Sequence, residues 1–162
     1  MNRYIFLDID GVLNNIHTDS VTPKGYTGIS GKLVQRLAGI VKGTGAKVVL
    51  TSDWKYGWKR NPSLCEEDAA YLNERLSKYR VHIYDRTYDE KIFDEFYTDR
   101  GVGIYRFMEK NADCENYVIL DDHIFADYDE QLRKHLVLTD PEKGLTEEDA
   151  QKACDILMGG AL

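Results

Sequence analysis

The stretch Arg3-Tyr4-Ile5-Phe6-Leu7-Asp8-Ile9-Asp10-Gly11-Val12-Leu13-Asn14 decides the fold of this chain. Its apolar, strand-forming residues predict a buried central strand. Asp8 ends the apolar run, and Gly11 lets the backbone turn just after the second acid, Asp10. Two acids that are two positions apart face the same side of a strand unless the chain bends between them. The end of this strand therefore holds two neighbouring negative charges.

The acid pair needs a positive partner if it is buried. Burying like charges so close together is costly without a cation or a shared proton, and a site built only from oxygen ligands favours Mg²⁺. Two other roles are open to the pair. The acids could simply end a strand at the solvent edge, or they could begin a calcium loop. The calcium loop is excluded because Gly11 follows Asp10 directly, whereas that loop needs a third acid before its glycine.

Length and composition indicate one globular domain over residues 1–162. The hydrophobic content of 43% excludes a disordered chain. The net charge of -7 argues against a surface that binds nucleic acid throughout, although a local basic patch stays possible. We see no apolar stretch that fits a signal peptide or a membrane span. The three cysteines lack metal spacing and fit a reducing compartment, so we expect a cytoplasmic protein without membrane partners.

Hydrophobic periodicity predicts strands separated by helices. Strands are predicted within residues 3–8, 46–51, 80–85, 117–120 and 136–138. Helices are predicted after Ser30, after Ser63, from Arg100, near residues 128–133, and from Thr146 to about Met158. Residues 86–99 are expected to be mostly loop. This order predicts an α/β fold: a doubly wound, parallel five-stranded sheet with helices on both faces.

Polar residues suited to a binding site follow three of the predicted strands. Asp8 and Asp10 follow the first strand, the hydroxyl pair Thr51-Ser52 follows the second, and the acid pair Asp121-Asp122 follows the fourth. Ligands of parallel sheets bind at the carboxyl ends of the strands. Three such strand ends together indicate one site better than any of them alone.

These segments resemble the four signatures of the haloacid-dehalogenase-like (HAD) phosphohydrolases. In chain order, the matching segments are residues 8–14, residues 48–52, Arg100 and residues 118–122. The strings Trp54-Lys55, Arg100-Gly101 and Gly144-Leu145-Thr146 are similar to a small HAD subfamily that is associated with RNA-repair proteins. The resemblance implies a Rossmann-like sheet and phosphoester hydrolysis that depends on Mg²⁺.

The resemblance also implies a role for each matched residue. Asp8 would be the nucleophile that forms an aspartyl-phosphate, and Asp10 would be the general acid and base. Thr51 would donate a hydrogen bond to a phosphoryl oxygen, and Arg100 would neutralise charge on the transferred group. Asp8, the backbone carbonyl of Asp10 and the pair Asp121-Asp122 would hold Mg²⁺. Which acid of the pair binds the metal directly is left open.

The third signature is the least secure of these matches. It is usually a lysine, and Lys91 is the rival candidate. We favour Arg100 because it begins a predicted helix just before the fourth strand, as the family pattern requires. Arginine does not replace lysine in every geometry.

The spacing of the signatures leaves no room for a cap domain. The 49 positions from Thr51 to Arg100 must already supply a helix, a strand and their loops. The site should therefore be open, so that it can admit a nucleotide or a 5′ or 3′ phosphate end of nucleic acid. A small-metabolite phosphatase acting on substrates such as sugar phosphates, and a non-catalytic phosphate-binding module, are the alternatives. The sequence does not indicate an oligomeric state.

The loop after the second strand and Gly11 of the first signature supply candidate substrate contacts. The expected contacts are Gly11, Ser52, Trp54, Lys55, Trp58 and Lys59. The aromatic rings could stack on a base, and the basic side chains could hold phosphates. Equally, the two tryptophans could pack the loop against the protein, and Ser52 could cap the following turn.

Overall fold

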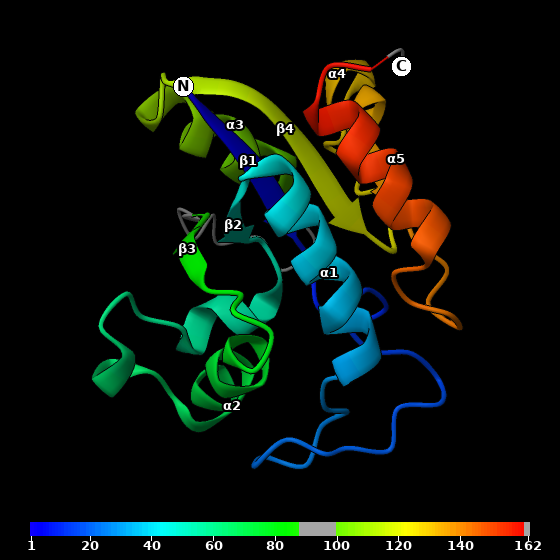
Figure 1. The fold of residues 1–162 in the computed structure, drawn as a ribbon. Helices are drawn as coiled ribbons and strands as arrows, with labels where there is room; N and C mark the ends of the chain where they lie inside the picture. Colours follow the sequence, from blue (N-terminus) through cyan, green and yellow to red (C-terminus); the bar gives the residue numbers. More distant parts are fainter. Residues whose placement is uncertain (88–99, 161–162) are drawn as a thin grey trace.

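The computed structural model describes residues 1–87 and 100–160 of the chain. Five parallel strands form one sheet in the order β3-β2-β1-β4-β5 (Figure 1). The strands are β1 (Asn2–Leu7), β2 (Lys47–Leu50), β3 (Ile83–Arg86), β4 (Cys114–Asp121) and β5 (Leu136–Leu138). The predicted α/β fold with a parallel five-stranded sheet is confirmed.

Helices cover both faces of this sheet. They are α1 (Gly31–Thr44), α2 (Glu67–Ser77), α3 (Arg100–Lys110), α4 (Glu130–Lys134) and α5 (Glu147–Leu157), with two 3₁₀ helices, η1 (Asp53–Gly57) and η2 (Pro62–Leu64). Alternate residues of a strand face opposite sides. Ile5 and Leu7 of β1 therefore belong to a core with α1, α2 and α5, whereas Tyr4 and Phe6 belong to a second core with α3 and α4.

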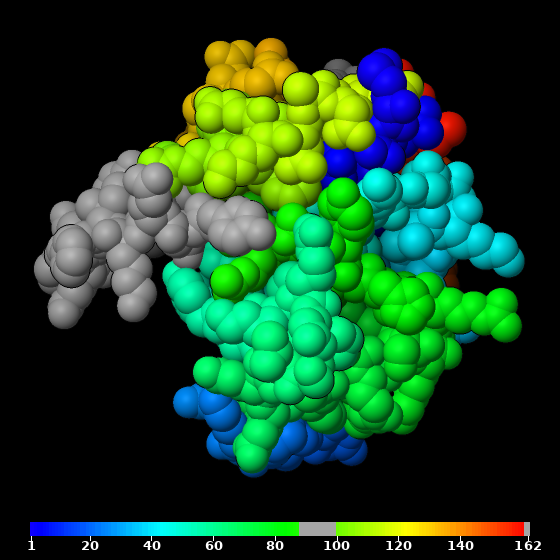
Figure 2. All heavy atoms as spheres, turned by 90° about the vertical axis from the view of Figure 1, so that its left-hand side faces the viewer, coloured from blue at the N-terminus to red at the C-terminus, as the bar shows by residue number. Residues whose placement is uncertain are grey.

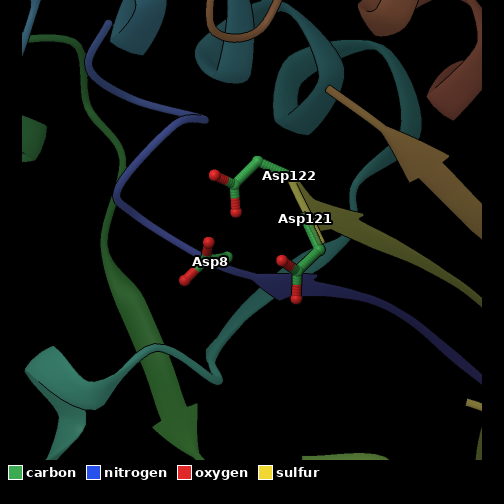
Figure 3. A group of neighbouring side chains, drawn as sticks. All are labelled: Asp8, Asp121 and Asp122. Carbon is green, nitrogen blue, oxygen red and sulfur yellow. The ribbon is translucent and has the colours of Figure 1, made fainter. Parts of the chain in front are cut away.

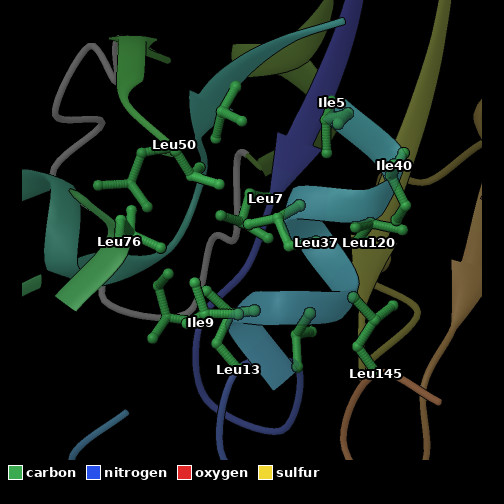
Figure 4. Packing of buried hydrophobic residues seen from close by; sticks show 14 of the residues in the cluster. Ile5, Leu7, Ile9, Leu13, Leu37, Ile40, Leu50, Leu76, Leu120 and Leu145 are labelled. Atoms are coloured by element: carbon green, nitrogen blue, oxygen red, sulfur yellow. The ribbon is translucent and has the colours of Figure 1, made fainter. Parts of the chain in front are cut away.

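The first core holds the centre of the sheet against α1. Figure 4 shows Leu37 and Ile40 of α1 lying against Leu7 of β1 and Leu120 of β4. Each of these four side chains is at most 1% exposed. Full burial of one such side chain contributes about 1.5–3 kcal/mol. This packing holds β1 and β4, the two strands that carry the acids, in a fixed relation.

The order of the strands reverses at β1. The chain proceeds outward from β1 through β2 to β3, and then crosses to β4 and β5 on the other side. In doubly wound sheets, ligands bind at such a switch point, outside the carboxyl ends of the strands. The register pairs Leu7 of β1 with Leu120 of β4. Asp8 and Asp121 each follow one residue of this pair. They therefore lie at the carboxyl ends of two strands that are hydrogen-bonded to each other.

The second helix begins later than predicted. α2 starts at Glu67 and not after Ser63. The side chain of Asn61 accepts a hydrogen bond from the backbone N–H of Ser63 and caps the separate turn η2. The prediction is wrong at this point because the sequence does not distinguish a short 3₁₀ turn from the start of a helix.

The ends of the remaining elements match the predictions in part. β3 starts at Ile83 and not at Arg80 as predicted; Arg80 has φ 60°, in the left-handed region that strands do not use. Ser30 lies at the N-cap position of α1, but its side chain makes no capping hydrogen bond. At α5, Thr146 and Asp149 form the predicted capping box.

The described residues add only connecting loops and the two 3₁₀ helices to the sheet and its helices. The expectation of a fold without a cap domain is thus confirmed. Residues 88–99, most of the predicted loop, lie outside the described part. Of the helices that the structure describes, none combines the length and the apolar character that crossing a membrane requires.

Candidate active site

Three carboxylates meet at the carboxyl ends of β1 and β4 (Figure 3). Asp8, Asp121 and Asp122 each offer an oxygen, and these oxygens lie within 4.8 Å of one another. Asp8 and Asp121 are buried and Asp122 is half-buried. The backbone N–H of Asp8 donates to the carbonyl of Leu120 over 2.9 Å, which continues the pairing of the two strands. The predicted convergence of the acidic strand ends is therefore observed.

Burial and repulsion disfavour the charged forms of these carboxyls. Burial is the largest cause that raises the pKa of Asp8, to about 8, and the charge of Asp121 adds to it. Burial also raises the pKa of Asp121, although the charge of Arg100 and a hydrogen bond from Tyr128 act in the opposite direction. Because the site disfavours the ionised forms of its carboxyl groups, a bound cation would stabilise those forms.

Arg100, the first residue of α3, lies between two of the acids. Its Nη1 is 3.1 Å from Asp8 Oδ1 and 3.1 Å from Asp121 Oδ2. Its guanidinium carbon lies 4.2 Å from the centre of the Phe125 ring. Burial acts to lower the pKa of Arg100, but the two carboxylates outweigh it and the pKa is raised. The rival candidate, Lys91, lies outside the described residues.

Thr51 brings a hydroxyl to the same edge of the sheet. Its backbone N–H donates to the carbonyl of Leu7 over 2.9 Å, which fixes Thr51 beside β1. The side chain is 1% exposed, and its Oγ1 has no hydrogen-bond partner among the described residues. A buried polar group without a partner costs about 1–3 kcal/mol. A ligand oxygen that accepts from this hydroxyl would recover that cost.

The carboxylate of Asp10 is held by two neutral donors. Asn14 Nδ2 donates to Oδ1 over 2.8 Å, and Trp54 Nε1 donates to Oδ2 over 3.1 Å. Among the described residues, the close group of carboxylates does not include the Asp10 side chain. Its expected contact with Mg²⁺ through the backbone carbonyl stays a prediction.

A groove of about 650 Å³ has Asp10 among its lining residues. Its walls come from the loop of residues 14–29, from η1 and from the start of α2. We call it the Asp10 groove; besides Asp10, its lining residues are Lys24, Tyr26, Thr27, Asp53, Trp54, Tyr56, Gly57, Glu66 and Asp68. In Figure 2 the blue loop of residues 14–29 lies directly below the segment with η1 and α2.

Comparison with known families agrees with this geometry. The family model that is described as the HAD domain in Swiss Army Knife RNA repair proteins matches residues 4–150. The chain belongs to this family. The resemblance inferred from the sequence is thereby confirmed, and membership implies a phosphohydrolase. A search of curated proteins finds no match.

Gly11 has a steric role in this HAD domain. Its φ is +80°, and a Cβ at this position would lie 2.3 Å from Asp122 Oδ2. Its N–H donates to Asn14 Oδ1 over 2.9 Å, and its carbonyl accepts from Thr139 Oγ1 over 2.7 Å. Both backbone groups of Gly11 thus have partners within the domain, and its contact with substrate stays a prediction.

Two residues that were predicted to contact substrate point into the HAD domain instead. Trp58 is 4% exposed, and its Nε1 donates to Asn73 Oδ1 over 3.2 Å. Lys55 is 3% exposed, and its Nζ donates to Thr87 Oγ1 over 3.1 Å. The structure buries them because η1 and the residue after it turn these two side chains inward, and their contact with substrate stays a prediction. An aromatic and basic composition does not reveal which side of a loop faces the core.

The remaining predicted contacts have different surroundings. Trp54 is half-buried and lines the Asp10 groove. Ser52 is buried, and its hydroxyl accepts from the backbone N–H of Trp54 over 3.3 Å, so it caps η1. Lys59 is exposed and lines a different hollow, with Arg60 and His82. Of the predicted contacts in this loop, Trp54 alone lines the groove beside Asp10.

Sequence reasoning missed Tyr128. Its hydroxyl donates to Asp121 Oδ2 over 2.8 Å, and its side chain is 1% exposed. Burial, followed by the charge of Asp121, raises the pKa of Tyr128, so the hydroxyl stays protonated as a donor. Asn14 ends the first signature, where the sequence assigns it no role, and the structure shows it holding Asp10. Neither contact can be predicted from the spacing of residues or from hydrophobic periodicity.

Proposed function

We propose that this HAD domain is a Mg²⁺-dependent phosphomonoester hydrolase that works through an aspartyl-phosphate on Asp8. One observation carries the proposal: the carboxylates of Asp8, Asp121 and Asp122 lie within 4.8 Å of one another. Arg100 supports it, since its guanidinium lies 3.1 Å from Asp8 and from Asp121. Such a site can hold both a cation and the negative phosphoryl group that Asp8 attacks.

The donor set fits Mg²⁺. Every side-chain ligand in the group is a carboxylate, and Mg²⁺ prefers oxygen ligands. Asp8, Asp121 and Asp122 would hold the ion, together with the backbone carbonyl of Asp10. When bound, Mg²⁺ would offset the charge of the phosphoryl oxygens and of the nucleophile.

In the first step, a carboxylate oxygen of Asp8 bonds to phosphorus as the bond from phosphorus to the leaving oxygen breaks. The carboxyl group of Asp10 gives its proton to that leaving oxygen. The hydroxyl of Thr51 donates to a phosphoryl oxygen, and Arg100 offsets the charge of the transferred group.

In the second step, Asp10 acts as a base. Its carboxylate takes a proton from a water molecule, the water oxygen bonds to phosphorus, and the bond to Asp8 breaks. Inorganic phosphate leaves and both acids return to their starting states. The donors Asn14 and Trp54, at 2.8 and 3.1 Å, hold the Asp10 carboxylate in one orientation for this transfer.

We propose nucleotides or phosphate ends of nucleic acid as substrates. The family description names RNA repair proteins, the described residues form no cap over the site, and three aromatic residues line the groove at Asp10. A small-metabolite phosphatase and a non-catalytic binding module, the two alternatives raised by the sequence, are the remaining outcomes of the test below.

Phosphate release from nucleotides, oligonucleotide ends and sugar phosphates, with and without Mg²⁺, tests the proposal. We expect turnover that EDTA abolishes and that added Mg²⁺ restores. Asp8→Asn should abolish it, and Asp10→Asn should lower kcat about 10²–10⁴-fold while binding persists. Asp19→Asn, at an exposed acid of the loop, is the matched control. Equal turnover by Asp8→Asn and the wild type would overturn the mechanism. Tight binding without any turnover would favour the module.

A further inference from the structure

The proposed general acid, Asp10, lines the Asp10 groove. Trp54 connects the two, because its indole N–H donates to Asp10 over 3.1 Å and its side chain lines the groove. A leaving oxygen that takes its proton from Asp10 must lie next to Asp10, beside this groove. The rest of the leaving group would then extend along the groove walls.

These walls carry exposed aromatic rings. Tyr26 is 67% exposed and comes from the loop of residues 14–29, whereas Tyr56 is 53% exposed and comes from η1. Together with Trp54, they give the groove three aromatic side chains from two segments. Bases stack on such rings whatever their identity, since every base has a π face. The walls are therefore suited to a flat aromatic group.

The charge of the groove limits what else the leaving group can carry. Among the described residues that line it, the acids besides Asp10 are Asp53, Glu66 and Asp68, and the one cation is Lys24. Lys24 is already paired: its Nζ is 3.2 Å from Glu66 Oε2, and its backbone N–H donates to Asp68 Oδ1 over 3.1 Å. A second phosphate in the groove would meet these carboxylates, and the described part of the lining offers it no free cation; like charges repel.

We infer that the Asp10 groove holds the sugar and base of a nucleoside monophosphate and rejects leaving groups that bring a second phosphate into it. The inference rests on the proposed function and narrows its substrate class. Within that class it favours single nucleotides over nucleoside bisphosphates, and over strands whose next phosphate would enter the groove.

Three phosphomonoesters and one acyl phosphate test this selection on the wild-type protein with Mg²⁺. They are adenosine 5′-monophosphate, adenosine 3′,5′-bisphosphate, phosphocholine, and acetyl phosphate as the reference without a ring. We expect kcat/KM for the monophosphate to exceed that for the bisphosphate about tenfold or more. Phosphocholine is included because aromatic and acidic walls also attract organic cations. A preference for it over the monophosphate would overturn the inference.

The rings are tested by Tyr26→Ala and Tyr56→Ala. Each should lower kcat/KM for the monophosphate about fivefold or more, the effect of losing one stacked ring. Turnover of acetyl phosphate should fall less than that of the monophosphate, because acetyl phosphate has no ring to stack on either tyrosine. Tyr26→Phe and Tyr56→Phe keep the rings and should retain the wild-type preference. Equal losses on both substrates would indicate a merely structural role.

The charges are tested by the double variant Glu66→Gln, Asp68→Asn. It removes two negative charges and releases Lys24 from its ion pair, so kcat/KM for the bisphosphate should rise about tenfold. The monophosphate should gain less than the bisphosphate, because it brings no second phosphate into the groove. Glu109→Gln, at an exposed glutamate of α3 outside the groove, is the control. No gain for the bisphosphate would contradict the proposed role of the groove charge.

The two proposals fail separately. If acetyl phosphate is hydrolysed with Mg²⁺ but the mono- and bisphosphate react equally well, the groove inference fails and the proposed function stands. If nothing is hydrolysed, calorimetric binding of the two adenosine nucleotides to Asp8→Asn still tests the groove. Equal affinities in that measurement would refute the inference, and tighter binding of the monophosphate would support it.

Discussion

The indole nitrogen of Trp54 lies 3.1 Å from Asp10 Oδ2, and its N–H donates a hydrogen bond to that oxygen. Asp10 follows β1 and Trp54 lies in η1 after β2, so the contact joins the ends of two adjacent strands. This hydrogen bond fixes the orientation of the Asp10 carboxylate, the proposed acid and base, without placing a charge next to it. Trp54 is thus a positioning residue for Asp10 as well as a wall of the groove.

Trp54→Phe removes this donor and keeps an aromatic ring. We expect kcat to fall about tenfold with a small change in KM, since a net hydrogen bond to a charged group contributes about 1.5–3 kcal/mol. The loss should be smaller for p-nitrophenyl phosphate, whose leaving oxygen needs little protonation. Steady-state kinetics on both substrates measures it. Trp58→Phe, which loses a comparable bond to Asn73 in the core, is the control. An equal loss of kcat in both variants would refute the positioning role.

Arg100→Lys keeps one positive charge but loses the planar guanidinium. The present side chain lies 3.1 Å from both Asp8 and Asp121 and covers the Phe125 ring. A lysine provides a point charge that does not reproduce this geometry. We therefore expect kcat/KM to fall about 10²-fold or more, the range for losing one charge-stabilising donor.

Phosphate-release assays measure the effect of Arg100→Lys. The control is Arg60→Lys, at an exposed ion pair with Asp85, which should leave turnover unchanged. Wild-type kcat/KM in Arg100→Lys would show that any cation at this place suffices.

Asp8 should make the metal-free protein less stable as the pH rises. Its pKa is about 8 in the folded protein and 3.8 without the fold's influence. Between these values the folded state keeps a proton that the unfolded state releases, so the free energy of unfolding falls with increasing pH. Asp8→Asn lacks this titration. In EDTA, its Tm should exceed that of the wild type by about 3 °C or more at pH 8, and the difference should vanish near pH 4.

Thermal unfolding between pH 4 and pH 8 measures this difference. Added Mg²⁺ should raise the Tm of the wild type more than that of Asp8→Asn, since only the wild type offers a carboxylate at residue 8. Parallel Tm curves for the two proteins over this interval would show that burial of Asp8 does not lower the free energy of unfolding as the pH rises.

Gly11→Ala should disturb the acid cluster directly. The added Cβ would lie 2.3 Å from Asp122 Oδ2, and φ at this position is +80°. We expect turnover to fall at least tenfold and stability to fall by about 2 kcal/mol, from strain in the left-handed region and the clash together. Gly45→Ala is the matched control, because φ is +68° there and a Cβ would meet nothing within 4 Å. Similar activity in the two variants would mean that Asp122 tolerates displacement.

The layout of the site could be predicted because it follows from the ends of apolar runs. The runs before Asp8, Thr51 and Asp121 are buried strands, and parallel strands bring their carboxyl ends to one edge. The same logic fails inside a turn. Trp58 and Lys55 are buried although their loop is rich in charge, since η1 and the residue after it turn them inward.

The contacts that refine the site have no sequence signal. Tyr128 reaches Asp121 from the segment before α4, and Trp54 reaches Asp10 from η1. Both depend on the exact course of a connection between regular elements. Periodicity places helices and strands, but it does not specify where a loop side chain points.

The register between β1 and β4 has a consequence for how the chain reaches its folded state. Leu7 pairs with Leu120, so the acids one residue beyond them come from segments more than a hundred residues apart. Neither segment alone offers more than a fragment of the cluster. Divalent-ion affinity should therefore arise only after this long-range pairing has formed. An ion titration during refolding would report when β1 and β4 pair.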